Sequence, residues 1–310
     1  MEHKEIWDVL DSTKIKAYLE CPRKFFYEYV VGWRSIEPNI HLEFGKAWHL
    51  AMEHLLVKGY EDEELVQAYT LFHNHYRKYF PEVMDDVYAP KNPANAFKAM
   101  REYVNRYREE DKNEEVLFTE IAGTVPIRAD KVIYFRMDSI IKKDGMYRSR
   151  EHKTGTTVSR QWIDQWSLDI QTGIYNHVLH CLYLEDEVWG VEINGTFLQK
   201  KENKFQRVPA RRTKRMMQVW FELVLDVVRR IEYDYWILEG GLAEDKEVMD
   251  CFMQNPTSCT NWFGCKFHDY CIAWSNPLKV VETEMPEGMH VSHWDPRAEE
   301  AKHTFNLEGV

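Results

Sequence analysis

The stretch RMDSIIKKDGMYRSREHKTG, residues 136–155, contains a tight turn between two runs of alternating or apolar residues. Asp144-Gly145 is a preferred two-residue connection between antiparallel strands. Counting outward from that turn sets Asp138 opposite Glu151. Opposed residues on antiparallel strands have Cβ atoms roughly 4.5 to 5.5 Å apart. The sequence therefore predicts a hairpin that brings two carboxylates to one site.

Two facing carboxylates repel each other unless a positive charge lies between them. Oxygen ligands of this kind suit Mg²⁺ or Mn²⁺. Lys153 lies two residues beyond Glu151 on the same strand face, where its ammonium could orient a water molecule or steady a phosphorane. The plain alternative is a surface hairpin with one cross-strand salt bridge. Strict pairing would also set Arg136 opposite Lys153, so we expect the strand to bend or twist nearby.

A histidine and an acid elsewhere in the chain, His49 and Glu120, are further candidates for this site. His49 and Glu53 lie four residues apart in the helical stretch EFGKAWHLAMEHLL and project from one face. His49 could add a nitrogen ligand, although a histidine on a partly apolar helix is more often packed and hydrogen-bonded. Glu120, at the end of VLFTE, is either another carboxylate of the site or a solvated strand end.

Gln171 and Tyr175 lie one helical turn apart. Either side chain could hold a phosphate or the hairpin, and a hydrogen bond within the helix explains the pair as well.

The cysteines form a second pattern. Cys259, Cys265 and Cys271 have C-x5-C-x5-C spacing, and Cys21 would be a fourth ligand if the N-terminus folds back. Four thiolates bind zinc or an iron-sulfur cluster, and zinc ribbons usually have close C-x2-C pairs. The spacing therefore favours an iron-sulfur cluster. Cys181 and Cys251 have no spacing partner and are expected to be bystanders.

Composition limits the possible compartment. The stretch MEHKEIWDVL at the start carries charges instead of an apolar export signal, and no run approaches the roughly 18 to 20 apolar residues of a membrane span. We expect a soluble, cytoplasmic protein without membrane contact, in which cysteines stay reduced and disulfides do not explain their pattern.

The chain is acidic overall, with a net charge of −11, but one segment is strongly basic. Such a stretch could hold a DNA backbone beside an acidic core. Its basic residues, interrupted by one acid, are Lys200, Lys201, Lys204, Arg207, Arg211, Arg212, Lys214 and Arg215.

Periodicity predicts a helical part over about 12–110, strands from 116 to 153, a helix over 161–184, a strand over 187–200 and a long helix from about 213 to 238. These patterns by themselves indicate a small antiparallel sheet with helices packed around it, an α/β (α+β) chain. The segment 281–310 is expected to be a peripheral tail.

Five sequence features occur in an order that resembles a known family. They are STKIKAYLECPRKFFYEYV with Cys21, FGKAWH, the hairpin of residues 136–155, QTGIY and the three late cysteines. The sequence resembles the RecB-type branch of the PD-(D/E)XK nucleases, in particular the iron-sulfur members among CRISPR-associated adaptation exonucleases, AddB-type helicase-nuclease subunits and phage recombination nucleases. The resemblance runs from Ser12 to about Cys271. One departure is the Arg-Met pair before Asp138, where the family usually has Gly-x-Ile or a similar run.

The resemblance implies a restriction-endonuclease-like core with a small mixed sheet flanked by helices. It implies one nuclease domain over 1–280, with a catalytic core at about 115–240 and an iron-sulfur loop at about 251–275. It also implies residue roles: metal binding by His49, Asp138 and Glu151, activation of water by Lys153, support by Gln171 and Tyr175, and a 4Fe-4S cluster on Cys21, Cys259, Cys265 and Cys271.

The expected function is a Mg²⁺- or Mn²⁺-dependent deoxyribonuclease, an exonuclease on DNA ends or single strands in recombination, repair or phage DNA processing. The alternative is an inactive DNA-end-binding scaffold for a helicase, recombinase or integrase. A zinc-bound regulator is a third possibility.

Overall fold

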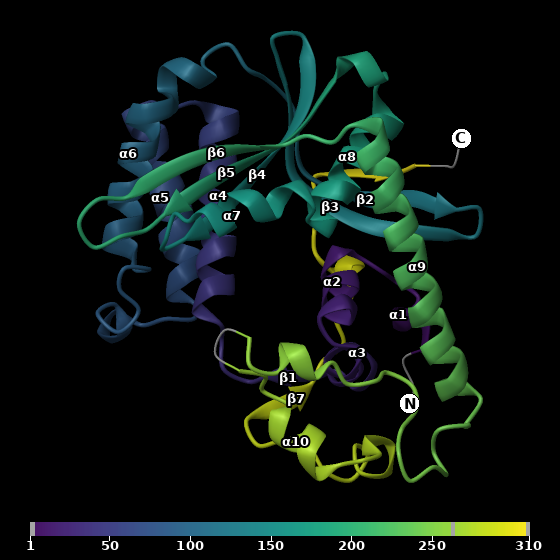
Figure 1. The fold of residues 1–310 in the computed structure, drawn as a ribbon. Helices are drawn as coiled ribbons and strands as arrows, with labels where there is room; N and C mark the ends of the chain where they lie inside the picture. The colour runs from purple at the N-terminus through teal and green to yellow at the C-terminus, as the bar shows by residue number, and fades with distance from the viewer. Residues whose placement is uncertain (1–3, 262–263, 308–310) are drawn as a thin grey trace.

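The computed structural model describes residues 4–261 and 264–307 (Figure 1). The ends of the predicted domain and tail, residues 1–3 and 308–310, lie outside the described residues, as do residues 262–263 between two of the late cysteines.

A six-stranded mixed sheet, in the order β6-β5-β4-β3-β2-β8, forms the centre of the fold. Neighbours β2 and β3, β3 and β4, and β5 and β6 are antiparallel, whereas β4 with β5 and β2 with β8 are parallel. The mixed sheet that the family resemblance implied is confirmed, and the purely antiparallel sheet expected from the hairpins alone is wrong. The strands are β2 (Glu115–Arg128), β3 (Lys131–Lys143), β4 (Met146–Gly155), β5 (Val188–Phe197), β6 (Lys204–Ala210) and β8 (His303–Asn306).

Helices flank the sheet, and two apolar clusters lie between them and the strands. One cluster joins α4, α5 and α6, and the other joins α2, α8 and α9 with the inward side of β2 and β3 (Figure 1). No helix of the described residues is both long and apolar enough to cross a membrane. The longer helices are α2 (Ser12–Glu20), α4 (Ile40–Lys58), α5 (Asp62–Arg77), α6 (Pro93–Asp111), α8 (Ile170–Leu182) and α9 (Lys214–Glu239), and the short ones are α1 (Lys4–Trp7), α3 (Pro22–Phe25), α7 (Arg160–Asp164) and α10 (His268–Ala273).

Local capping explains where the helices of the site begin. The Asn39 side chain accepts hydrogen bonds from the first amides of α4, and the Asp169 side chain accepts from the amides of Gln171 and Thr172 in α8. Because Asp169 starts a new helix, the continuous helix expected over 161–184 is divided into α7, a 3₁₀ turn and α8. That division fixes Gln171 in the first turn of α8.

The chain ends are joined to the rest of the fold by short strands. β1 (Trp33–Ser35) pairs with β7 (Met289–Val291), and β8 adds to the edge of the main sheet beside β2. Gly123 makes the second contact possible, because a Cβ at this position would lie 1.7 Å from the carbonyl oxygen of Phe305. Part of the segment expected as a peripheral tail thus becomes an edge strand.

Candidate metal-dependent active site

The predicted hairpin forms and then opens into a fork. Asp144 and Gly145 both have positive φ, as a two-residue hairpin turn requires. The β3 to β4 ladder runs from the turn to the pair of Ser139 with Arg150 and stops there. Beyond that pair, β4 continues beside β5 alone. The strands therefore separate where Asp138 and Glu151 would have paired.

At the fork, hydrogen bonds from backbone amides to the two carboxylates take the place of the backbone pairing between β3 and β4. Glu151 Oε1 accepts a hydrogen bond from the amide of Asp138 at 3.1 Å, and Asp138 Oδ2 accepts one from the amide of His152 at 2.7 Å. Lys153 Nζ lies 3.9 Å from Glu151 Oε2. The two acids and the amine are thus adjacent, and the separation of the strands relieves the expected clash of Arg136 with Lys153.

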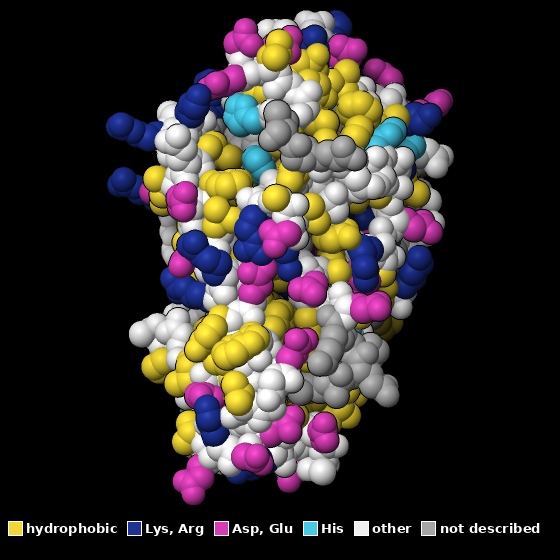
Figure 2. Space-filling view, turned by 90° about the vertical axis from the view of Figure 1, so that its right-hand side faces the viewer, with side chains coloured by type: hydrophobic (Ala, Val, Ile, Leu, Met, Phe, Trp, Pro, Cys, Tyr) yellow, Lys and Arg dark blue, Asp and Glu magenta, His cyan; other side chains and the backbone are white. Residues whose placement is uncertain are grey.

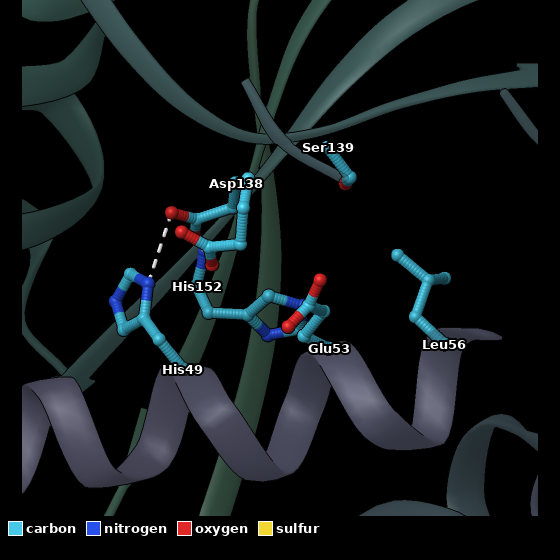
Figure 3. A pocket seen from close by; sticks show the side chains of 7 residues that line it. His49, Glu53, Leu56, Asp138, Ser139 and His152 are labelled. Atoms are coloured by element: carbon cyan, nitrogen blue, oxygen red, sulfur yellow. Dashed lines mark hydrogen bonds and ion pairs between the residues drawn. The ribbon is translucent and has the colours of Figure 1, made fainter. Parts of the chain in front are cut away.

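His49 reaches the same place from α4. Its Nδ1 lies 2.9 Å from Asp138 Oδ1, across the space between helix and sheet (Figure 3). The buried side of α4, which includes Phe44, Trp48 and Met52, packs into the apolar cluster of α4 to α6 and fixes the direction in which His49 points. The structure thus brings together a histidine and an acid that are far apart in the sequence.

The environment drives the pKa values of the two acids apart. Burial acts to raise the pKa of Asp138, but the charges of His49 and Lys153 outweigh it and hold that pKa below its usual range. Burial raises the pKa of Glu151 well above its ordinary value, and the charge of Asp138 raises it further. At Glu151 the charge of Lys153 does not outweigh burial and Asp138, and a bound cation would add the missing positive charge.

A small cavity lies on the α4 side of the fork. His49, Glu53, Glu120, Asp138 and His152 line it, and the labelled side chains converge on it in Figure 3. It leaves about 10 Å³ for the centre of a water-sized sphere, which is room for about one water molecule or ion. Glu151 and Lys153 do not line this cavity.

Glu120 borders the cavity because the strand is irregular at this residue. Its φ is 46°, and the β2 to β3 pairing omits Glu120 and Asp138. Arg136 donates a hydrogen bond to the Glu120 carboxylate at 2.8 Å. Burial, and then the charge of Asp138, raise the pKa of Glu120, and Arg136 opposes both. Glu120 is therefore beside the centre but already paired.

Gln171 and Tyr175 support β3 from the opposite face. Gln171 Nε2 donates to the Tyr175 hydroxyl at 2.6 Å, and that hydroxyl donates to the carbonyl oxygen of Arg136. Burial raises the pKa of Tyr175 well above its ordinary value, so the phenol stays protonated and keeps this donor. The pair thus forms the hydrogen bond within the helix that was one explanation for it, and Tyr175 also contacts the hairpin through Arg136.

The sequence pattern did not single out His152 as a member of the site. It is 4% exposed, neither ring nitrogen has a hydrogen-bond partner among the described residues, and burial lowers its pKa to about 3. Strand alternation places the residue between Glu151 and Lys153 on the other face of β4, where its ring contacts His49 and Tyr103. No sequence signal marks it, because the position gains its surroundings only when α4 docks.

The donor chemistry of His49, Asp138 and Glu151 suits a hard divalent cation. Among the described residues, however, no group of three or more His, Cys, Asp or Glu side chains is arranged as ligands of one metal ion. The reason is visible in the contacts: the candidate ligands are hydrogen-bonded to one another and to the amides of the fork.

The four predicted cluster cysteines share a second cavity. Cys21, Cys259, Cys265 and Cys271 all line it, and it leaves about 170 Å³ for the centre of a water-sized sphere. All six cysteines are free thiols, and Cys251 lies fully buried in the apolar core away from this cavity. The N-terminal cysteine thus does meet the late loop, with the amide of Asn255 3.4 Å from Cys21 Sγ.

The basic segment divides into parts with different surroundings. Arg207, expected on a DNA-binding surface, is held instead by Asp111, with N to O distances of 2.6 and 2.7 Å, and stacks on Tyr107. Lys200, Lys201, Lys204 and Arg215 are exposed. Arg211, Arg212 and Lys214 line a third cavity, where Arg212 is partly buried and the other two are exposed. On the right-hand side of the molecule, which Figure 2 turns to the viewer, Lys and Arg side chains are interspersed with Asp and Glu. That face has no continuous basic surface.

The model of the PD-(D/E)XK nuclease superfamily matches residues 12–271, which include the fork, α4 and all four clustered cysteines. The chain belongs to the PD-(D/E)XK nuclease superfamily. Membership implies a phosphodiester-hydrolysing nuclease that uses divalent metal ions and acts on DNA. The match does not distinguish the RecB-type iron-sulfur branch from the rest of the superfamily.

No curated protein matches the chain. Among solved structures, one described as "Crystal structure of SSO0001" is similar, with 16% identity over 59% of this chain and 84% of the other. Its TM-score is 0.27, so no residue role is taken from it.

Proposed function

We propose that this chain is a metal-dependent DNA exonuclease that acts on ends or single strands, with its catalytic centre at the fork between β3 and β4. The observation that carries the proposal is the meeting of Asp138, Glu151 and Lys153 at the fork with His49 from α4. Processing of DNA in recombination, repair or phage replication is the setting that the resemblance favours.

Each residue has a role that follows from its contacts. Asp138, His49 and Glu151 would hold Mg²⁺ or Mn²⁺, with Glu120 close enough to contribute if it leaves Arg136. When bound, the cation supplies charge that stabilises the phosphorane-like transition state and acidifies a water molecule. Lys153, beside Glu151, would orient the attacking water, and Tyr175 keeps β3 in place through the Arg136 carbonyl.

The split pKa values support this assignment. A carboxyl group like Glu151, whose pKa is raised by burial and by a neighbouring acid, ionises when a cation binds beside it. Asp138 already carries the charge that attracts a cation. The surroundings thus favour the ionised form of Asp138 and the neutral form of Glu151, and a cation beside Glu151 would offset the second effect.

The test is cleavage of labelled single- and double-stranded DNA with defined 5′ and 3′ ends, with Mg²⁺, Mn²⁺ or a chelator. Asp138→Asn and Glu151→Gln should each reduce kcat about 10³-fold, since loss of a metal ligand removes several kcal/mol of transition-state stabilisation. Asp144→Asn is the matched control, because it makes the same change in the same hairpin and Asn tolerates the positive φ of the turn.

Cleavage that persists at the wild-type rate in the Asp138→Asn, Glu151→Gln double variant would remove the proposal. Unchanged binding of DNA ends with and without chelator, with no release of nucleotides, would indicate instead the scaffold that serves a helicase, recombinase or integrase.

We also propose that the cavity lined by Cys21, Cys259, Cys265 and Cys271 holds a 4Fe-4S cluster. Four thiols line this one cavity, and their sequence spacing differs from the close C-x2-C pairs of zinc ribbons, which favours a cluster over one zinc ion. Bonds to the cluster would join the N-terminal helices to a loop more than 230 residues later, as the contact between Cys21 and Asn255 already does.

The cluster is tested by iron and sulfide analysis of anaerobically purified protein and by its broad absorption at about 400 nm. Cys21→Ser should abolish the absorption and lower Tm, because both ends of the chain lose a shared anchor. Cys181→Ser is the control, since this thiol lies outside the cavity. A colourless wild-type protein that contains one zinc per chain would contradict the cluster.

A further inference from the structure

A third cavity lies between the C-terminal half of α8, the start of β5 and the start of α9. It leaves about 440 Å³ for the centre of a water-sized sphere, and this volume is in the range of pockets that bind small molecules. The lining residues that matter here are His177, His180, Trp189, Arg211, Arg212 and Lys214. None of them belongs to the fork at Asp138 and Glu151.

The cations of this cavity have no acidic partners, unlike most arginines around the sheet. Arg150 and Arg207 are both held by carboxylates within 2.8 Å. Among the described residues, none of Arg211, Arg212 and Lys214 forms an ion pair, and Glu185 is the one acid of the cavity lining. In a chain of net charge −11, this concentration of unpaired positive charge indicates an anionic ligand.

Two of these side chains are held in place by neutral groups. Arg212 donates from Nη2 to the carbonyl oxygen of Asp169 at 2.6 Å and to Thr172 Oγ1 at 3.2 Å, while its Nε is buried without a partner. Arg211 lies over the ring of Trp189, 5.5 Å from the centroid. Neither guanidinium group forms an ion pair among the described residues, although the charge of Asp169 acts on Arg212, so both keep donors for an anion.

The start of α9 adds to the positive potential. α9 is 26 residues long, has no acidic residue in its first turn and begins with Lys214 and Arg215. Cations at the positive end of a helix dipole are unfavourable, and a bound anion would offset that repulsion. Helices usually begin with acidic residues, and α9 departs from this preference at the place where its first residues line the cavity.

We propose that this cavity is a binding site for a phosphate monoester, as found on a nucleotide or at the end of a nucleic-acid strand. The arginines would hold the phosphate oxygens, and the amides at the start of α9 would add neutral donors. The link to a strand end rests on the proposed nuclease function, whereas phosphate binding itself does not.

The test measures binding in chelator, so that cleavage cannot occur. The probes are a fluorescein-labelled oligonucleotide with a 5′ phosphate, the same strand with a 3′ phosphate, the same strand with hydroxyl ends, and a nucleoside monophosphate as competitor. Wild-type protein should bind a phosphorylated strand about tenfold more tightly than the hydroxyl strand, since hydrogen bonds to charged groups are each worth about a factor of ten or more.

The double variant Arg211→Gln, Lys214→Gln should lose this tenfold preference and keep the affinity for the hydroxyl strand. Its matched control is Lys200→Gln, Lys201→Gln, which removes the same charge from exposed positions of the same basic segment outside the cavity. The control should bind all strands somewhat more weakly and retain the preference. Unfolding curves of both variants check that the fold is intact.

Each arm has a definite consequence. Preference for one phosphorylated end assigns the site to that end of a strand and supports the site. If the monophosphate abolishes this preference by competition, the same site also accepts a free nucleotide. Equal binding of phosphorylated and hydroxyl strands by wild type, or an equal loss of preference in the control, overturns it. Because Asp138→Asn tests cleavage separately, phosphate selectivity without metal-dependent cleavage refutes the nuclease proposal and leaves this one standing.

Discussion

Replacement of Gly123 by alanine should detach the C-terminal strand from the sheet. A Cβ on residue 123 would lie 1.7 Å from the Phe305 carbonyl oxygen and 2.6 Å from its carbonyl carbon, and both groups are backbone atoms that cannot rotate away. β8 must therefore move by more than an ångström, which the four-residue parallel ladder of Ile121–Thr124 with His303–Asn306 cannot absorb.

The stability lost in Gly123→Ala has an upper limit, because β8 can detach while the rest of the sheet stays intact. The ladder hydrogen bonds contribute about 1 kcal/mol each, and the edge contact of Phe305 with Phe118, at 5.1 Å between ring centroids, adds about 1 kcal/mol. We expect a loss of about 3 to 5 kcal/mol of local stability, confined mainly to this strand.

Hydrogen exchange followed by mass spectrometry measures this directly. In Gly123→Ala the amides of residues 303–306 should exchange nearly as fast as in an unfolded peptide, while the β3 and β4 amides stay protected. Gly45→Ala is the matched control: nothing lies within 4 Å of its added Cβ, and alanine favours helix α4 by about 0.5 to 1 kcal/mol. If the amides of residues 303–306 in Gly123→Ala exchange as slowly as in the wild type, the close approach of Gly123 to Phe305 is refuted.

Three further changes test buried polar groups. Burial lowers the pKa of Lys91 from 10.5 to about 8. Between about pH 8 and pH 10.5 the unfolded chain therefore keeps the Lys91 proton that the folded chain has lost. The free energy of unfolding consequently rises with pH over this range. Lys91→Met should therefore be more stable than wild type by about 3 kcal/mol at pH 7.5. Urea unfolding should show that this difference in stability becomes smaller toward about pH 10. A difference in stability that does not change with pH would contradict the role of the Lys91 charge. Arg150 is fully buried between Glu114 and Glu192, at 2.6 and 2.7 Å. Arg150→Met should cost about 3 to 5 kcal/mol, because both buried acids lose their closest cation, and Lys143 beside Glu114 and Arg148 beside Glu192 compensate only in part. Arg160→Met, at a 93% exposed side chain, should cost less than about 0.5 kcal/mol. Tyr175→Phe should lower kcat about tenfold by freeing the Arg136 carbonyl, with the binding of DNA unchanged; a change in binding alone would show that Tyr175 contacts substrate instead.

The sequence by itself determined the hairpin and its acids. The turn at Asp144 and Gly145 needs two residues with positive φ, and strand pairing next to such a turn has one register, so Asp138 and Glu151 could be placed near each other by counting. The ends of β2, β3 and β4 follow the predicted strand runs within a few residues, because alternating apolar residues and turn residues are local signals.

Only the tertiary structure decided what surrounds the hairpin. Four features depend on contacts between distant segments: the parallel pairing of β4 with β5, the approach of His49, the burial of His152 and the pairing of Arg207 with Asp111. The edge strand β8 depends on the missing side chain of Gly123. The physical reason is that a turn restricts its immediate neighbours, whereas the choice among distant partners is made by burial and charge compensation in the assembled core, which no single stretch of sequence contains.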